Sequence, residues 1–377
     1  MTTESQTWTL VASEDDLQSM MQFLRVQPAI AVDTESNSLY AYHERVCLIQ
    51  ISIPGADYIV DPLVGPDLSP LGEVFADPGI QKVFHAAEQD IAGLKRDFGF
   101  RFAHLFDTMR VTRILGWPRA GLADLLREHF GVHTDKRYQR YNWGQRPLSP
   151  EALRYAAWDT RYLLPLRDRQ MRELERIGRV QQAAESFARL AQTPPAGPHD
   201  DPDAFWRVRA VHALNDRERA VLWQLYLWRD ELASAQDRPP FRVMSDDVLV
   251  RLARARPRTL SELATLGRFP GHWLRRHGPA LLEAVARGEN GPVPASPYVS
   301  GSDDERERFQ SLREWRRRVA EARGVAPDLI LPNTVLRALA TRNPQTLEEL
   351  AEVDGIGPWA CETWGQEILQ VLQSFKK

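Results

Sequence analysis

Cysteine is scarce in this sequence, and long apolar stretches are lacking. Only two cysteines occur among the 377 residues, and Cys47 lies far from Cys361. Two distant cysteines exclude a disulfide framework and a cysteine zinc site, and they fit a reducing cytosol. No apolar run approaches the roughly 20 residues of a membrane helix, and the polar, acidic N-terminus is unlike a secretory signal. We therefore expect a cytoplasmic protein without a membrane partner.

A strong net charge is also lacking, which argues against a molecule that is basic throughout and binds nucleic acid by charge alone. The formal net charge is −3, with 43% hydrophobic and 26% charged residues. These proportions are ordinary for a globular protein. The length is too great for one compact core, so two or three domains are expected.

Two segments have the composition of linkers. Residues 193–203 (TPPAGPHDDPD) and 288–305 (GENGPVPASPYVSGSDDE) are rich in Pro, Gly and Asp and have no apolar period. They predict three domains, at residues 1–192, 204–288 and 305–377.

The first region alternates strand-like and helical patterns. Strands are indicated by AIAVDTE, RVCLIQISI, DYIVDP and GIQKVFHA, and a long helical pattern covers residues 149–177, with Ser149 as N-cap and Pro150 at the first helical position. The apolar first strand is expected in the middle of a sheet. The predicted fold class is α/β, a mixed sheet flanked by helices.

The last two regions are copies of one another. Residues 243–266 align without a gap on residues 330–353, at an offset of 87, and Trp228 matches Trp315 at the same offset. One offset that holds across helices and turns indicates a tandem domain. Each copy is expected to form a small all-α bundle.

Acidic residues with unusual placement occur in the first region. Asp33 and Glu35 come at the end of the first strand, two apart and therefore on one face. Asp90 stands near the start of a helix that follows another strand. Tyr155 and Asp159 are four apart in a helical pattern, again on one face.

Four converging carboxylates would repel one another unless a cation compensates them. Oxygen-only ligands point to Mg²⁺ or Mn²⁺. Two such ions suit in-line attack on a phosphodiester, and Tyr155 is placed to orient the attacking water. Each residue also has an ordinary interpretation: Asp90 as a helix-dipole residue, Tyr155 as core, and Asp159 as a surface acid.

Order and context favour the functional interpretation. The segments DTES, FHAAEQDI and YAAWDT resemble the three exonuclease motifs of the DEDD superfamily, in the branch with a tyrosine four residues before the last aspartate. The segments RVCLIQIS and DKRYQRYNWGQRPLSPEALRYAAWDTRYLLPL resemble ribonuclease D, and the two repeats are similar to HRDC domains, so the resemblance covers almost the whole chain.

This resemblance implies a ribonuclease H-like fold and a metal-dependent 3′–5′ exoribonuclease that acts in tRNA maturation. Asp33, Glu35, Asp90 and Asp159 match the metal-binding acids, and Tyr155 matches the water-positioning tyrosine. We expect one ion on Asp33, Glu35 and Asp159, a second on Asp33 and Asp90, and release of nucleoside 5′-monophosphates.

Further substrate contacts are expected from four residues. His85 is a candidate donor to a phosphate, although a structural role is about equally expected. Thr34 and Gln50 are candidates for the pocket of the terminal nucleotide, and Arg146 is a candidate partner of a phosphate.

The sequence departs from the family pattern at three places. Residues 140–143 read RYNW where relatives tend to have Ser-Asp-Trp, and Trp158 and Thr160 stand where small or branched residues are usual. These positions bear on the substrate channel and leave the four acids and the tyrosine intact.

The expected partner is RNA with a free 3′ end, in particular a tRNA precursor, bound by a monomer. The repeats are expected to help grip RNA through residues 272–278 and 314–324, whose tryptophans have bundle-core positions as the alternative. Three other functions remain open: a DNA 3′–5′ exonuclease, a non-catalytic nucleic-acid-binding protein, and an interaction scaffold.

Overall fold

The computed structural model describes residues 8–134, 137–197, 204–267, 269–294 and 302–374. By their internal contacts the residues form two compact units: Met1–Ser36, Val46–Ala196 and Gly301–Lys377 in one, and Asn37–Arg45 and Gly197–Ser300 in the other. No helix in the described ranges is both long and apolar enough to cross a membrane.

The first unit is built on a mixed sheet of six strands in the order β1-β4-β3-β2-β5-β6. The strands are β1 (Trp8–Val11), β2 (Ala29–Ser36), β3 (Val46–Ile53), β4 (Ala56–Val60), β5 (Gln81–Phe84) and β6 (Leu105–Asp107). Strand β3 is antiparallel to β2 and β4, whereas β5 is parallel to β2 and β6. The apolar strand β2 lies inside the sheet, as its composition predicts.

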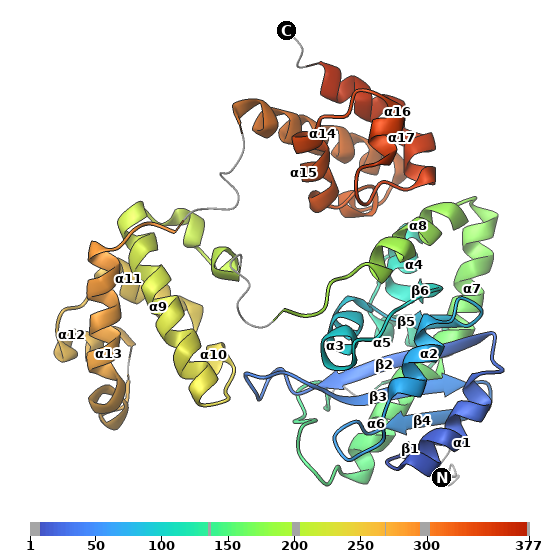
Figure 1. Cartoon of the computed structure of the whole chain (residues 1–377), viewed down its shortest axis with the longest axis horizontal. Coiled ribbons are helices and arrows are strands. Elements are labelled where there is room, and N and C mark those ends of the chain that lie inside the picture. The colour runs from blue at the N-terminus through green and yellow to red at the C-terminus, as the bar shows by residue number, and fades with distance from the viewer. Residues whose placement is uncertain (1–7, 135–136, 198–203, 268, 295–301, 375–377) are drawn as a thin grey trace. The chain divides into compact units, whose positions relative to one another are not determined.

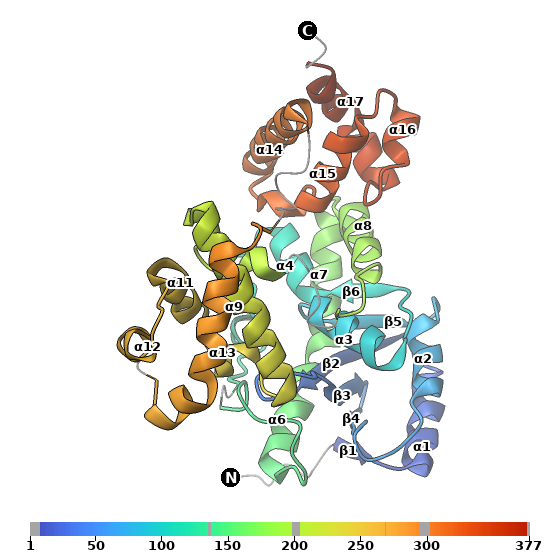
Figure 2. The same ribbon diagram turned by 60° about the vertical axis from the view of Figure 1, so that its left-hand side comes forward.

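Helices cover both faces of this sheet, which confirms the predicted fold class. Figure 2 shows α1 and α2 on one side of the sheet and α6 on the other. The helices of this region are α1 (Glu14–Leu24), α2 (Ser69–Ala76), α3 (Glu88–Phe98), α4 (Thr108–Leu115), α5 (Leu122–Phe130), α6 (Pro150–Arg161), α7 (Leu163–Arg176) and α8 (Val180–Ala191).

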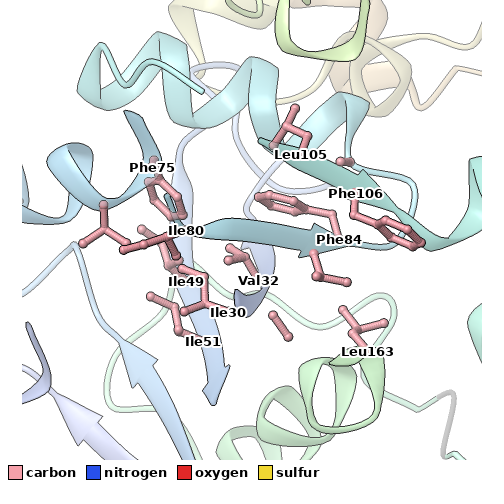
Figure 3. Packing of buried hydrophobic residues seen from close by; sticks show 14 of the residues in the cluster. Ile30, Val32, Ile49, Ile51, Phe75, Ile80, Phe84, Leu105, Phe106 and Leu163 are labelled. Carbon is pink, nitrogen blue, oxygen red and sulfur yellow. The ribbon is translucent and has the colours of Figure 1, made fainter. Parts of the chain in front are cut away.

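Two apolar cores hold the sheet between these helices. The larger contains Val32, Ile49 and Phe75, each fully buried, and Figure 3 shows these side chains packed together. The smaller, on the α6 side, includes Leu48 and Trp143. Ile49 and Leu48 are neighbours on β3 and point to opposite faces, so each face of this strand packs against helices. Full burial of such a side chain contributes about 1.5–3 kcal/mol.

Two features differ from the sequence-based expectation. Strand β1 and helix α1 occupy the N-terminal segment, where polar and acidic residues conceal the pattern. The predicted helix over 149–177 is two helices, α6 and α7, separated at Tyr162. Pro165 has no N–H for the carbonyl of Arg161, and its ring disfavours helical backbone there, so the helix breaks before it.

The two repeats are all-helical, as expected (Figure 1). The first contains α9 (Asp216–Ala235), α10 (Pro240–Val243), α11 (Asp246–Ala255), α12 (Leu260–Gly267) and α13 (Gly271–Asn290). The second contains α14 (Asp303–Arg323), α15 (Asn333–Arg342), α16 (Leu347–Ala351) and α17 (Pro358–Gln373). Helices α14, α15, α16 and α17 each begin 87 residues after α9, α11, α12 and α13.

The repetition extends to single interactions. Arg229 donates to the carbonyl of Met244 at 3.0 Å, and Arg316 donates to that of Leu331 at 2.7 Å. Both α9 and α14 begin with a capping box, which satisfies exposed backbone N–H groups of the first turn. The repeats are therefore two copies of one bundle.

Candidate active site

Strand β2 brings two of the predicted acids to the middle of the sheet. Asp33 lies opposite Gln50 of β3, and Glu35 lies opposite Leu48. Residues two apart on a strand share a face, and cross-strand partners share it too. Leu48 packs in the core beneath α6, so both carboxylates lie on the face that α6 covers.

Helix α6 carries Tyr155 and Asp159 to the same face. The Ser149 hydroxyl accepts a hydrogen bond from the backbone N–H of Ala152 at 3.1 Å, and Pro150 follows it, so the start of the helix is fixed. Ala152 and Ala156 are fully buried against the sheet. Their small side chains let the helix approach β2 and β3 closely, which places Tyr155 and Asp159 beside Asp33.

Asp90 comes from the first turn of α3. The Thr34 hydroxyl donates to Oδ1 of Asp90 at 2.5 Å, so a residue of β2 holds this acid in place. The turn before α3 is held by Asp107, which accepts from the backbone N–H groups of Ala86 and Ala87 at 3.3 and 2.9 Å. Ala86 has a φ of 63°, a left-handed conformation that is costly for alanine and needs such support.

Asp107 was not among the residues expected from the sequence. Its signal was present, because it is the N-cap of α4 and accepts from the N–H of Arg110 at 2.9 Å. Asp107 also shapes the turn that leads to Asp90. This second role depends on the pairing of β5 with β6, and no local sequence pattern predicts it.

Two of the acids, Asp33 and Asp159, and the tyrosine line a cavity of about 310 Å³. Asp33, His85, Tyr155 and Asp159 form part of its wall, and the start of α5 forms another part. The cavity lies where β2 ends, the usual position for sites in sheets of this kind.

Burial raises the pKa values of these carboxyls, and mutual repulsion adds to the effect at Asp33 and Glu35. Burial, followed by the charges of Asp90, Asp159 and Glu35, raises the pKa of Asp33 well above its usual range. Burial and the charges of Asp159 and Asp90 likewise raise the pKa of Glu35. Burial raises the pKa of Asp90 to about 6 and that of Asp159 to about 7. Ionising such a group in the metal-free fold costs free energy, which a bound cation would offset.

Tyr155 stays protonated beside these acids. Burial, followed by the charge of Asp159, raises the pKa of the phenol above its usual range, and its hydroxyl hydrogen-bonds to Asp159. Its ring is packed by Tyr138 and Trp143, with ring centroids 5.4 and 6.2 Å away. The hydroxyl therefore serves as a fixed hydrogen-bonding group and not as a base.

The donor set fits hard divalent cations. It offers only carboxylate oxygens, the ligands that Mg²⁺ and Mn²⁺ prefer. Beside Asp33, the amide of the fully buried Gln50 has no hydrogen-bond partner in the described part of the chain. An orphaned buried amide costs about 1–3 kcal/mol, and such a group is expected where a ligand completes the site. In the described ranges, no three Asp, Glu, His or Cys side chains already have the spacing of a metal's ligands, so the carboxylates must turn toward an ion to bind it.

The four residues expected to contact substrate differ in their surroundings. His85 lines the cavity, and its Nδ1 lies 2.9 Å from the Thr108 hydroxyl, while burial lowers the pKa of its imidazole. Thr34 supports Asp90, and Gln50 is fully buried beneath the acids.

Arg146 is engaged within the protein. Its guanidinium donates to both carboxylate oxygens of Asp61, at 2.7 and 2.6 Å, and to the carbonyls of Cys47, Trp143 and Gln145. These contacts favour a structural role that anchors the segment before α6, and they leave little capacity for a phosphate.

Of the two tryptophans expected to grip RNA, Trp315 lies in a bundle core and Trp273 packs half-buried against one. Trp273 stacks on Phe269 at 4.5 Å and meets Trp228 edge to face at 6.1 Å. Trp315 is 3% exposed and donates to Glu367 at 2.8 Å. These contacts support the core alternative for the two tryptophans over a stacking platform for RNA.

Comparison with known families agrees with this geometry. Residues 9–175 match the family model described as 3′–5′ exonuclease. Residues 218–285 and 305–372 each match the HRDC domain, in the two helical repeats.

Named relatives and solved structures are similar over nearly the whole chain. Ribonuclease D of Pseudomonas paraeruginosa is 30% identical over 364 residues, which covers 93% of this chain and 93% of that protein. Ribonuclease D of Escherichia coli is 29% identical over 371 residues, covering 97% and 98%. The crystal structure of E. coli RNase D superposes with a TM-score of 0.71 at 27% identity, covering 99% of this chain and 100% of that one.

The acids at the end of β2, the matched exonuclease and HRDC segments and the full-length relatives agree with one another. The chain belongs to the ribonuclease D family of 3′–5′ exoribonucleases.

Proposed function

We propose that this protein trims RNA 3′ ends one nucleotide at a time, with two divalent cations, and releases nucleoside 5′-monophosphates. The observation that carries the proposal is the set of four carboxyls whose pKa values are raised by burial, and for Asp33 and Glu35 also by the charges of the other acids. Such a cluster is costly for a fold to keep unless cations use it.

Each residue of the cluster has a role in this proposal. Asp33, Glu35 and Asp159 hold one Mg²⁺ or Mn²⁺, and Asp33 and Asp90 hold the second. When bound, the cations supply an activated water and stabilise the charge on the leaving 3′ oxygen. Thr34 keeps the carboxylate of Asp90 in position through its 2.5 Å hydrogen bond.

Tyr155 orients the attacking water. Because its pKa is raised, the phenol keeps its proton at any working pH and acts through hydrogen bonding alone. His85 lies at the wall of the same cavity, and its hydrogen bond to Thr108 favours a role in positioning this wall.

The proposed substrates are tRNA precursors with extra 3′ nucleotides. The E. coli relative is described as an exoribonuclease involved in structured RNA processing, which supports a structured RNA here. All four acids come from one chain, so the site needs no residue of a second copy, which is compatible with the monomer proposed as the active form.

The first repeat offers a surface for gripping RNA. Arg209, Arg251 and Arg254 line a cavity of about 610 Å³ in the second unit, together with Asp247. Clustered arginines bind phosphates through charge and a planar hydrogen-bonding fork. We assign the RNA grip of the first repeat to this cluster and not to Trp273.

The test is digestion of a 3′-extended tRNA precursor and of a matched single-stranded DNA, with Mg²⁺ and with EDTA. The proposal predicts stepwise loss from the RNA 3′ end that needs Mg²⁺ and is abolished in Asp33→Asn. Preference for the DNA would overturn the substrate assignment and favour a DNA exonuclease. Binding without hydrolysis of either would favour a non-catalytic binding protein.

A further inference from the structure

A second cavity adjoins the active site and has no part in the mechanism above. It measures about 230 Å³ and shares Thr134, Tyr155 and Asp159 with the cavity of the acids. A ligand that places a phosphodiester at the acids therefore has this space next to it. The volume is below the roughly 300–1,000 Å³ of sites for drug-sized ligands, which suits a single flat ring system.

The walls of the second cavity are aromatic, and its lining includes Arg154 as well as the acidic Glu151. Tyr138, Tyr155 and Trp158 are half-buried side chains that line it. Arg154 stands four residues before Trp158 on α6, so both lie on the same side of that helix, and its side chain is exposed. Aromatic rings next to a cation form the combination that binds the bases and phosphates of single strands.

Trp158 is held rigidly by a chain of contacts that reaches into the sheet. The Arg161 guanidinium lies over its ring, 5.3 Å from the centroid, and donates to Asp57 at 3.0 Å. Asp57 also accepts from the Ser52 hydroxyl at 2.6 Å, and Ser52 lies 2.7 Å from the Thr160 hydroxyl. Ser52, Asp57 and Thr160 are all buried.

This series of contacts links Trp158 and Thr160, two positions at which the sequence departs from the family pattern. Thr160 contacts Ser52, which donates to Asp57, and Asp57 in turn accepts from Arg161 beside Trp158. Trp158 is thus partly preorganised, which lowers the side-chain entropy lost on binding.

We propose that the nucleobase next to the scissile phosphate binds in the second cavity and stacks on Trp158, with Arg154 at the rim beside the RNA backbone. The inference rests on the proposed function, since it takes RNA as the ligand of the acids. Stacking accepts every base, so Trp158 strengthens the hold on any 3′ end. Each stacked base contributes about tenfold or more to affinity.

The experiment removes the base and the tryptophan separately. Short RNAs with a 5′ fluorophore carry an intact 3′ end, an abasic 3′-terminal nucleotide or an abasic penultimate nucleotide. Dissociation constants are measured by fluorescence anisotropy with Mg²⁺ in an Asp33→Asn background, which prevents digestion. The variants are Asp33→Asn alone and Asp33→Asn combined with Trp158→Ala, Trp158→Phe or Trp8→Ala.

The expected result is a coupling between base and ring. In Asp33→Asn, one of the two abasic RNAs should bind about tenfold more weakly than the intact RNA. When Trp158→Ala is added, the intact and the abasic RNA should differ in affinity by less than about twofold, because the stacking partner of the base is gone. Trp158→Phe should keep much of the discrimination, and Trp8→Ala, a half-buried tryptophan outside both cavities, should keep all of it.

The inference is overturned if Trp158→Ala discriminates between the intact and abasic RNAs as well as its parent does at both positions. This outcome is distinct from failure of the proposed function, which would appear as no hydrolysis of intact RNA by the unmutated protein. The binding comparison does not depend on turnover, so it decides the role of Trp158 in either case.

Discussion

Asp159→Asn should stabilise the metal-free protein while it removes activity. Burial raises the pKa of Asp159 from 3.8 to about 7. Each pKa unit corresponds to about 1.4 kcal/mol, so ionised Asp159 destabilises the metal-free fold by at most about 4 kcal/mol. The carboxyl is partly exposed, and solvent screening reduces this cost to roughly 1–2 kcal/mol.

The sign of the effect depends on pH. The folded-state pKa lies above the unfolded one, so the wild type loses stability as pH rises from about 4 to about 7. Asparagine carries no charge at any of these pH values. The gain from Asp159→Asn should therefore be full at pH 8, smaller at pH 5, and absent below pH 4.

Thermal unfolding in EDTA, followed by circular dichroism, measures this gain. For a unit of this size, 1 kcal/mol shifts Tm by about 2–4 °C, so we expect a rise of roughly 2–8 °C at pH 8. Asp168→Asn, an exposed carboxyl of α7 paired with Arg167, is the matched control and should give no rise. A Tm that is unchanged or lowered by Asp159→Asn at pH 8 would refute the claim that the acid cluster is electrostatically costly. Mg²⁺ should raise the Tm of the wild type more than that of the variant.

Three further predictions concern neighbouring residues. Tyr155→Phe should lower kcat about a hundredfold with little change in KM, because only the water-orienting hydroxyl is lost. Single-turnover kinetics measures this effect, and a change confined to KM would contradict it. Thr34→Val removes the hydrogen bond that lowers the pKa of Asp90, so that pKa should rise above about 6. In Mg²⁺ titrations of activity, the Mg²⁺ concentration for half-maximal activity should be several-fold higher than in the wild type at pH 6.5 and close to it at pH 8.5. Arg254→Glu should weaken RNA binding and flatten its dependence on salt, measured by anisotropy from low to physiological salt. A variant that binds as tightly as the wild type at both salt concentrations would remove the first repeat from the RNA-binding surface.

The sequence carried most of the information on the acids. Asp33 with Glu35 follows strand periodicity, and Tyr155 with Asp159 follows helix periodicity, so local rules predict which residues share a face. The tandem repeat was equally accessible, because the 87-residue offset appears in the residues themselves and returns in the helix boundaries.

The rest depends on contacts between distant segments. Asp107 is a recognisable N-cap, but its hold on the turn before Asp90 follows from strand pairing. The support of Trp158 joins residues 108 positions apart, Ser52 and Thr160. No periodicity or motif encodes such a chain, since it exists only once β3 and α6 have packed.

The phosphate contact expected of Arg146 shows the same limit. From the sequence alone, an arginine just before α6 could bind a phosphate of the substrate or a carboxylate of the protein. Only the fold places Asp61 within 2.6 Å of its guanidinium.

The central claim is that the four acids use divalent cations to hydrolyse RNA from its 3′ end. The most direct measurement is chromatographic identification of the products of a 5′-labelled RNA, for the wild type and Asp33→Asn, each with Mg²⁺ and with EDTA. The account predicts a ladder that shortens one nucleotide at a time and nucleoside 5′-monophosphates, for the wild type with Mg²⁺ alone. Undiminished hydrolysis by folded Asp33→Asn, or hydrolysis in EDTA, would contradict it.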